Sequence, residues 1–324
     1  MYERILVPLD GSKLAEHVLP YVRALAQAHK LPVTVLQAYA SIPPEVVAAV
    51  EPGPAPAPGP QGQAAAERRS FLAQVSAERK QMAEEYVNSV AERLRMEKIA
   101  AKAVVQDAPP DEAIAAEAGI GDGTLIVMST HGRSGVARLV VGSVMDKVLR
   151  STSSPLFVVR PREGEPPSQG AAIRNIVLPL DGSPVAEQVL PYAAALATAL
   201  RATVRPAWVI PPFPAYYGGY MGDASGALHD LVEETEKAAR EYLGRIRARL
   251  MREGVAKVYE SVLFGNPAES IIDMARTMPY SLVAMTTHGR SGVGRFVMGS
   301  VADQVVRHSG APVLLVRAKG EKQG

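Results

Sequence analysis

The 324-residue chain is long enough for two domains of ordinary size, each with its own core. Its 35 basic and 33 acidic residues leave a formal net charge of +2, which predicts no strong attraction to nucleic acid or to an anionic membrane. The absence of cysteine excludes disulfides, thiolate metal sites, iron–sulfur clusters and a cysteine nucleophile. The sequence contains neither a recognisable signal peptide nor an apolar run of membrane-spanning length, so we expect a cytoplasmic protein.

Two segments of the chain occur twice. Residues 4–26 recur as 175–197 with 15 of 23 positions identical, and residues 131–160 recur as 288–317 with 17 of 30 identical. A repeat this long indicates two duplicated domains and not a solenoid of short units. We place the domains at residues 1–160 (the first half) and 173–318 (the second half). The Pro- and Gly-rich residues 161–172 are expected to form an exposed linker.

Apolar runs alternate with helical patterns in chain order. The first half predicts strands near 4–9, 33–39, 102–107, 124–130 and 155–160, and helices near 13–29, 64–98, 110–118 and 143–152. The second half predicts strands near 175–180, 202–209, 257–264, 281–287 and 312–317. Strands that are apolar on both faces and alternate with helices predict an α/β fold, with two open parallel sheets covered by helices on both faces. Ser12 and Ser183 are expected to cap the first helix of each half.

Two loops differ from the rest in composition. Residues 41–63 are rich in Pro, Gly and Ala, and we expect them to be mobile. Residues 210–226 carry Tyr216, Tyr217 and Tyr220, which leaves two interpretations open. The tyrosines could form a lid or a partner surface, or the segment could be an ordinary surface loop, which we favour.

Two further loops in each half carry the candidate binding residues. One follows the first strand and contains Asp10-Gly11-Ser12 or Asp181-Gly182-Ser183. The other follows the fourth strand and ends in Gly142-Ser143 or Gly299-Ser300, directly before a helix. Ligands of open α/β sheets bind beyond the carboxyl ends of the strands where the strand order reverses. Both loops would converge there if the first and fourth strands are neighbours.

The glycine loop has the properties of a phosphate site. A glycine lets phosphate approach the backbone, and the helix that follows offers N–H groups and a favourable dipole. Ser143 and Ser300 add hydroxyl groups, and positive charge could come from Arg133, Arg138, Arg290 and Arg295. Asp10 and Asp181 would repel a bare phosphate, so we assign them to ribose hydroxyls or to a bridging Mg²⁺. The alternative is that both loops are only turns and helix caps.

These loops resemble those of the universal stress protein family, and the resemblance covers both halves apart from the linker and the variable loops. The ATP-binding branch of that family carries Gly-x2-Gly-x9-Gly-Ser/Thr. Its second and third glycines match Gly132 and Gly142, then Gly289 and Gly299, whereas Ser129 and Thr286 replace the first. The resemblance implies a five-stranded sheet of order 3-2-1-4-5 in each half. It also implies nucleotide contacts at Asp10 and Asp181, an adenine-side backbone contact at Ala38 and Ala207, and further contacts at Pro8, Arg133, Ser143, Val144, Pro179, Arg290, Ser300 and Val301.

The resemblance implies a protein that binds an adenine nucleotide (ATP, ADP or AMP), with Mg²⁺ at Asp10 and Asp181. We expect a nucleotide-responsive binding module and at most a slow ATPase, because His131 and His288 have no fixed carboxylate partner and are better explained as turn residues. Two alternatives stay open: a protein-interaction module with vestigial pockets, and a true enzyme such as a nucleotidyl transferase.

The last strand of each half predicts how the halves associate. Residues 155–160 and 312–317 are apolar edge strands, and an unpaired apolar edge invites aggregation. Mutual pairing about a pseudo-twofold axis would remove both edges at once, as in an intrachain dimer. The rival is that each edge pairs with another chain. A homodimer and an unknown protein partner are left open.

Overall fold

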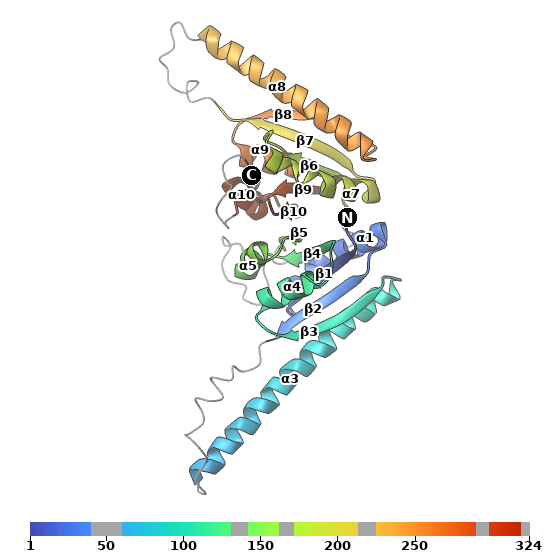
Figure 1. Cartoon of the computed structure of the whole chain (residues 1–324), viewed down its shortest axis with the longest axis vertical. Coiled ribbons are helices and arrows are strands. Elements are labelled where there is room, and N and C mark those ends of the chain that lie inside the picture. The colour runs from blue at the N-terminus through green and yellow to red at the C-terminus, as the bar shows by residue number, and fades with distance from the viewer. Residues whose placement is uncertain (40–59, 131–141, 162–171, 213–224, 290–297, 319–324) are drawn as a thin grey trace, which may run out of the picture.

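The computed structural model describes residues 1–39, 60–130, 142–161, 172–212, 225–289 and 298–318. Within these ranges, ten strands form one sheet of order β3-β2-β1-β4-β5-β10-β9-β6-β7-β8 (Figure 1). Each half contributes five parallel strands in the order 3-2-1-4-5, which confirms the predicted fold class. The loop tyrosines, His131, Gly132, Arg133, Arg138, Arg290, Arg295 and most of the expected linker lie outside the described residues.

The elements of the first half follow the predicted order. Its strands are β1 (Arg4–Pro8), β2 (Val33–Tyr39), β3 (Ala101–Asp107), β4 (Thr124–Ser129) and β5 (Leu156–Val159). Its helices are the 3₁₀ turn η1 (Ala15–Val18), α1 (Leu19–His29), α3 (Pro60–Met96), α4 (Pro110–Ala118) and α5 (Ser143–Ser151). The helix expected at 13–29 is therefore divided in two. Pro20 has no N–H to donate to the preceding turn, so a helix cannot run through it unbroken.

The second half repeats this plan. Its strands are β6 (Asn175–Pro179), β7 (Thr203–Ile210), β8 (Ser261–Phe264), β9 (Ser281–Thr286) and β10 (Val313–Val316). Its helices are α6 (Pro184–Glu187), α7 (Leu190–Leu200), α8 (Ser225–Arg252), α9 (Pro267–Thr277) and α10 (Ser300–His308). The strand expected at 257–264 is shorter, with only a Val204–Val258 bridge before β8. Pro206 interrupts the ladder there because it has no N–H to donate.

Serine caps begin the first helical turn of each half, as the sequence predicts. Ser12 Oγ accepts a hydrogen bond from Ala15 N, and Ser183 Oγ accepts one from Ala186 N, both at 3.1 Å. Pro184 occupies the first position of α6.

The two halves join through their last strands, as predicted. β10 pairs with β5 in antiparallel register, with Leu314 opposite Phe157. Around this seam, Tyr2 Oη donates to Tyr192 O (3.3 Å) and Arg317 Nη1 donates to Arg150 O (2.8 Å). The edge strands of the two halves are therefore covered by each other.

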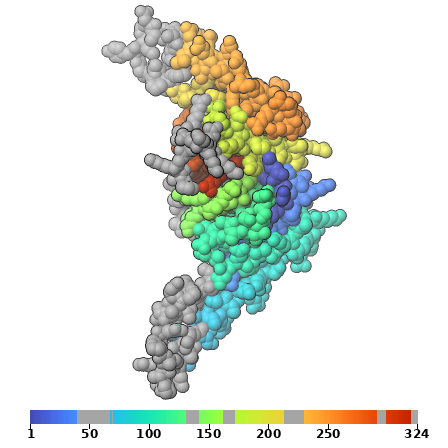
Figure 2. All heavy atoms as spheres, viewed as in Figure 1, coloured from blue at the N-terminus to red at the C-terminus, as the bar shows by residue number. Residues whose placement is uncertain are grey.

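Helices cover both faces of the sheet. One apolar cluster lies between the sheet and α1, α3, α7 and α8, and the other lies between the sheet and α4, α5, α9 and α10. Both clusters include residues of both halves. The long helices α3 and α8 lie at opposite ends of an elongated molecule (Figure 2).

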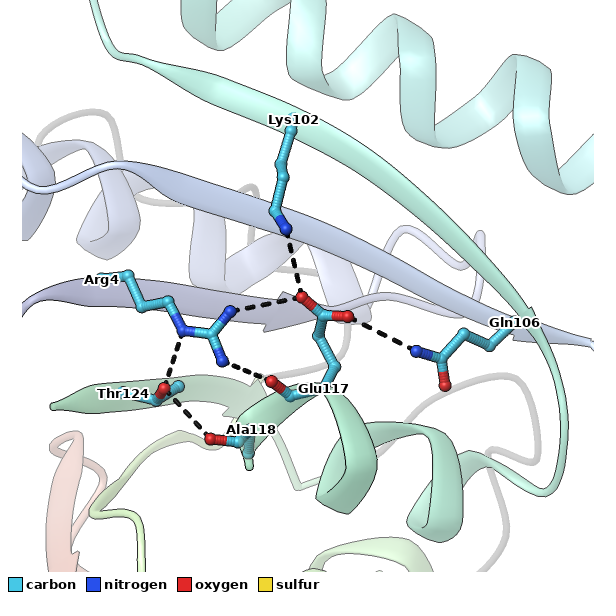
Figure 3. A network of polar contacts seen from close by, with 6 residues as sticks. All are labelled: Arg4, Lys102, Gln106, Glu117, Ala118 and Thr124. Carbon is cyan, nitrogen blue, oxygen red and sulfur yellow. Dashed lines mark hydrogen bonds and ion pairs between the residues drawn. The ribbon is translucent and has the colours of Figure 1, made fainter. Parts of the chain in front are cut away.

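An ion network forms around the buried Glu117 in the first half (Figure 3). Glu117 of α4 accepts from Arg4 Nη1 and Lys102 Nζ, both at 3.3 Å, and from Gln106 Nε2 at 3.4 Å. Arg4 also donates to Thr124 Oγ1 (2.8 Å) and to the Glu117 carbonyl. The equivalent positions of the second half carry no ion pair of this kind. Asn175 lies at the position of Arg4, and Met274 lies at the position of Glu117.

Candidate functional site

The candidate site lies where the strand order reverses. β1 has β2 on one side and β4 on the other, and β6 lies likewise between β7 and β9. The loops that leave the carboxyl ends of these neighbouring strands carry the predicted residues. This is the position at which open α/β sheets bind ligands.

The aspartate loops are tight turns. Pro8 and Pro179 are the last residues of β1 and β6. Asp10 Oδ1 accepts from Ser12 N at 2.9 Å, and the equivalent Asp181 Oδ1 accepts from Ser183 N at 2.9 Å and from Ser183 Oγ at 2.6 Å. The glycine between them needs its conformational freedom, with φ near +83° at Gly11 and +81° at Gly182. Both aspartates therefore build their turns.

The aspartate loop and the glycine loop meet in the second half. A Cβ placed on Gly289 would lie 2.3 Å from Asp181 Oδ2, so a larger residue there would require the Asp181 carboxylate to turn away. The predicted convergence of the loops is present there. The equivalent residue of the first half, Gly132, lies outside the described part of the chain.

The helix-start glycines are held by the chain itself. Gly142 and Gly299 directly precede α5 and α10. A Cβ on Gly142 would lie 2.3 Å from Thr130 O, and one on Gly299 would lie 3.1 Å from Thr287 O. Close backbone packing thus explains the glycine at 142 without any ligand, a reason that the sequence did not reveal. Ser143 and Ser300 begin the helices, whereas Val144 and Val301 pack against the apolar cluster.

The residues that replace the family's first glycine belong to the ends of β4 and β9. Thr286 is buried, and its Oγ1 donates to His288 O at 2.6 Å. His288 Nδ1 lies 3.1 Å from Thr287 Oγ1. The threonine hydroxyls therefore shape this loop, and His288 takes part in the turn. Ser129 occupies the matching place on β4.

The structure corrects one assumed equivalence. Leu36 O accepts from Leu9 N, and Ala207 O accepts from Leu180 N, so Ala207 corresponds to Leu36. The counterpart of Ala38 is Val209, two residues later. Ala207 is fully buried and lies within the paired part of the strand, so it is not the structural equivalent of Ala38. The offset of 171 between residues 4–26 and 175–197, carried on to residue 38, gives the same equivalence.

A cavity of about 520 Å³ opens beside the aspartate turn of the first half. Its walls are the turn, the end of β2 and the middle of α3, formed by Gly11, Gln37, Ala38, Tyr39, Arg79, Met82, Ala83 and Tyr86. The predicted residue Ala38 therefore lines an actual hollow. The contribution of α3 was not predicted. A signal for it exists in the repeat Ala83-x-Glu-Tyr86 and Ala239-x-Glu-Tyr242.

Polar groups fix the wall formed by α3. Tyr86 Oη donates to Glu16 Oε1 at 3.0 Å, and Arg93 Nη2 lies 3.2 Å from Glu16 Oε2. Burial, followed by the negative charge of Glu16, raises the pKa of Tyr86 far above its usual value, so this phenol stays neutral. In the second half, Arg249 contacts Glu187 at 3.2 Å, and burial raises the pKa of Tyr242 in the same way.

The described residues hold no preformed metal-binding cluster. No group of three or more His, Asp or Glu side chains there could hold a metal ion by itself. Asp10 and Asp181 could each supply one carboxylate to a cation that is also held by phosphate oxygens, which is how Mg²⁺ is usually bound. No helix of the described part is long and apolar enough to cross a membrane.

Comparison with known proteins identifies the class. A profile of the Universal stress protein family matches residues 1–160 and 172–317. The chain therefore belongs to the universal stress protein family, with two copies of its domain.

Individual relatives agree with this assignment. A universal stress protein of Mycolicibacterium smegmatis is 23% identical over 322 residues, which cover 97% of each chain. The Synechocystis universal stress protein Sll1388 is 30% identical over 150 residues, 44% of this chain and 97% of its own. A crystal structure of a universal stress protein from Archaeoglobus fulgidus covers 97% of this chain and 98% of its own, with a TM-score of 0.62 and 18% identity, which supports the fold.

Proposed function

We propose that this protein binds an adenine nucleotide and acts as a nucleotide-responsive module in the stress response of the cytoplasm. The observation that carries the proposal is the cavity of about 520 Å³ between Gly11 and Ala38, at the carboxyl edge of the sheet. Its volume lies within the ordinary range of small-molecule sites. It adjoins the aspartate turn, so a base in the cavity would bring its ribose toward Asp10.

The phosphates would extend toward the glycine loop. The starts of α5 and α10 supply N–H groups and the positive ends of helix dipoles, and Ser143 and Ser300 supply hydroxyls. Pro8, Ser129 and Val144 in the first half, and Pro179, Thr286, Gly289 and Val301 in the second, complete the proposed contacts, together with Gly132, Arg133 and Arg290. A Mg²⁺ ion bound with the nucleotide would neutralise phosphate charge, with Asp10 or Asp181 as its protein ligand.

The proposal is binding with at most slow hydrolysis. His288 is engaged with Thr287, and its geometry supports a turn residue more than a general base. Occupancy would order the loops and thereby bias a surface for a protein partner or a second copy of the chain. The second candidate is an interaction module with vestigial pockets. The close approach of Gly142 to Thr130 favours it, because this glycine would persist without a ligand.

Analysis of the purified protein tests the proposal. The protein is denatured, and released nucleotides are identified by chromatography with stoichiometry per chain. Titration calorimetry then measures ATP, ADP and AMP with Mg²⁺, and phosphate release is followed in parallel. We expect retained or added adenine nucleotide to bind and phosphate release to stay slow. Neither retention nor binding at millimolar nucleotide would leave the interaction module as the better description.

A further inference from the structure

The side chain of Gln37 is unusual within the cavity of the first half. It points to the same face of β2 as Val33 and Val35, toward α3, because alternate residues of a strand share a face. Gln37 is only 7% exposed, and among the residues that the structure describes its Oε1 has no hydrogen-bond partner. Buried amide oxygens are normally satisfied. An unpartnered one in the wall of a cavity indicates a ligand that carries a hydrogen-bond donor.

The second half places a tryptophan at this position. The register that equates Leu36 with Ala207 also equates Gln37 with Trp208. The opposite wall is the same in both halves, since Tyr86 and Tyr242 occupy equivalent places on α3 and α8. The Trp208 ring contacts Tyr242 edge-to-face, with 5.2 Å between ring centroids and 72° between planes. The indole therefore occupies the space between strand and helix that is hollow beside Gln37.

The size of the indole suggests what the hollow accepts. Indole and purine are both flat fused systems of a five- and a six-membered ring. The second half thus supplies from its own chain a ring of the shape that the first half lacks. A purine amino group could satisfy Gln37 Oε1, whereas the indole ring of Trp208 closes the equivalent space to any base.

We propose that the chain binds one purine nucleotide, in the first half, where Gln37 accepts a hydrogen bond from the amino group of the base, and that Trp208 closes the base site of the second half. This inference rests on the proposed function and deepens it. It restricts the nucleotide to the contacts proposed for the first half. It therefore predicts one bound ATP per chain, although both halves retain the glycine loop.

Calorimetry with ATP and Mg²⁺ gives the first test, with thermal unfolding and circular dichroism as controls for folding. The wild type should bind one ATP per chain, Gln37→Trp none, and Trp208→Gln two. Gln37→Leu, which retains the volume but not the acceptor, should keep one site with about tenfold weaker affinity.

Fluorescence gives a second readout that needs no mutation. Trp208 is the single tryptophan of the chain, so its emission reports on the second half alone. Saturating ATP should leave its emission maximum and its quenching by acrylamide unchanged. Two equivalent ATP sites, or one site retained in a folded Gln37→Trp variant, would overturn this inference and leave the proposed function standing. Absence of any nucleotide binding would overturn the proposed function itself.

Discussion

Gly142 and Gly299 occupy the same position in the two halves, yet their surroundings predict different costs for a methyl group. In Gly142→Ala the new Cβ would lie 2.3 Å from Thr130 O, a backbone atom, so the two segments must separate by about 1 Å. Overpacking of this kind costs about 1–3 kcal/mol. In Gly299→Ala the distance to Thr287 O is 3.1 Å, and a shift of a few tenths of an ångström relieves it. We expect that change to stay within about 0.5 kcal/mol.

Thermal unfolding of the two single variants checks this difference. A loss of one kcal/mol lowers Tm by about 2–4 °C in a domain of about 150–250 residues. Gly142→Ala should therefore lower Tm by several degrees, and Gly299→Ala should lower it little. Each variant is the matched control of the other, because both add one methyl before a helix. Equal Tm losses, or a neutral Gly142→Ala, would refute the steric reasoning. If it holds, a change at Gly142 reports on folding and cannot by itself demonstrate a phosphate contact.

Three further outcomes follow from named contacts. Asp181→Ala should lower stability by about 1–2 kcal/mol because Ser183 N and Oγ lose their acceptor. Asp181→Asn keeps an acceptor oxygen and should lose less in denaturant unfolding. Burial raises the pKa of Tyr2 above its usual value, so the native state keeps a proton that the unfolded chain releases. The free energy of unfolding should then fall by up to about 1.4 kcal/mol per pH unit above pH 10, and Tyr2→Phe should make that fall shallower in urea titrations at pH 9–11. Glu117→Ala should cost about 1–3 kcal/mol, because Arg4 loses its ion pair and keeps only its bonds to Thr124 Oγ1 and to the carbonyl of residue 117. The double change Arg4→Asn with Glu117→Met, which copies the second half, should restore most of the lost Tm.

The sequence was sufficient to predict the fold class and the positions of the strands. Buried parallel strands are apolar on both faces, and residues 125–128 and 313–316 therefore stand out from their surroundings. The strand order within each half came from the resemblance to the universal stress protein family. The repetition of an apolar last strand in both halves indicated which two edge strands pair. The aspartate turn was also predictable, because Asp-Gly-Ser after a strand has a defined local geometry.

The walls of the site were less accessible to prediction. The contacts of Gln37 with α3 join residues more than 40 positions apart, and no local pattern encodes them. The equivalence of Ala207 was misjudged although the sequence contains the information. The offset of 171 between residues 4–26 and 175–197, carried on through the second strand, equates Leu36 with Ala207 and Ala38 with Val209. The hydrogen bond from Leu180 N to Ala207 O agrees with that register.

The duplicated halves have diverged in a pattern that their packing explains. At the central seam, β5 and β10 are each other's partner, so a change in one must suit the other, and both remain uniformly apolar. Away from the seam, most contacts of a residue lie within its own half, so a substitution in one half does not require a matching substitution in the other. Glu117 and Met274 are one such pair, and Gln37 and Trp208 are another. The pairing of β5 with β10 therefore constrains the sequence only near the seam. The residues between strand and long helix can differ between the halves, as Gln37 and Trp208 do. This difference is what the proposed combination of one open and one closed base site needs.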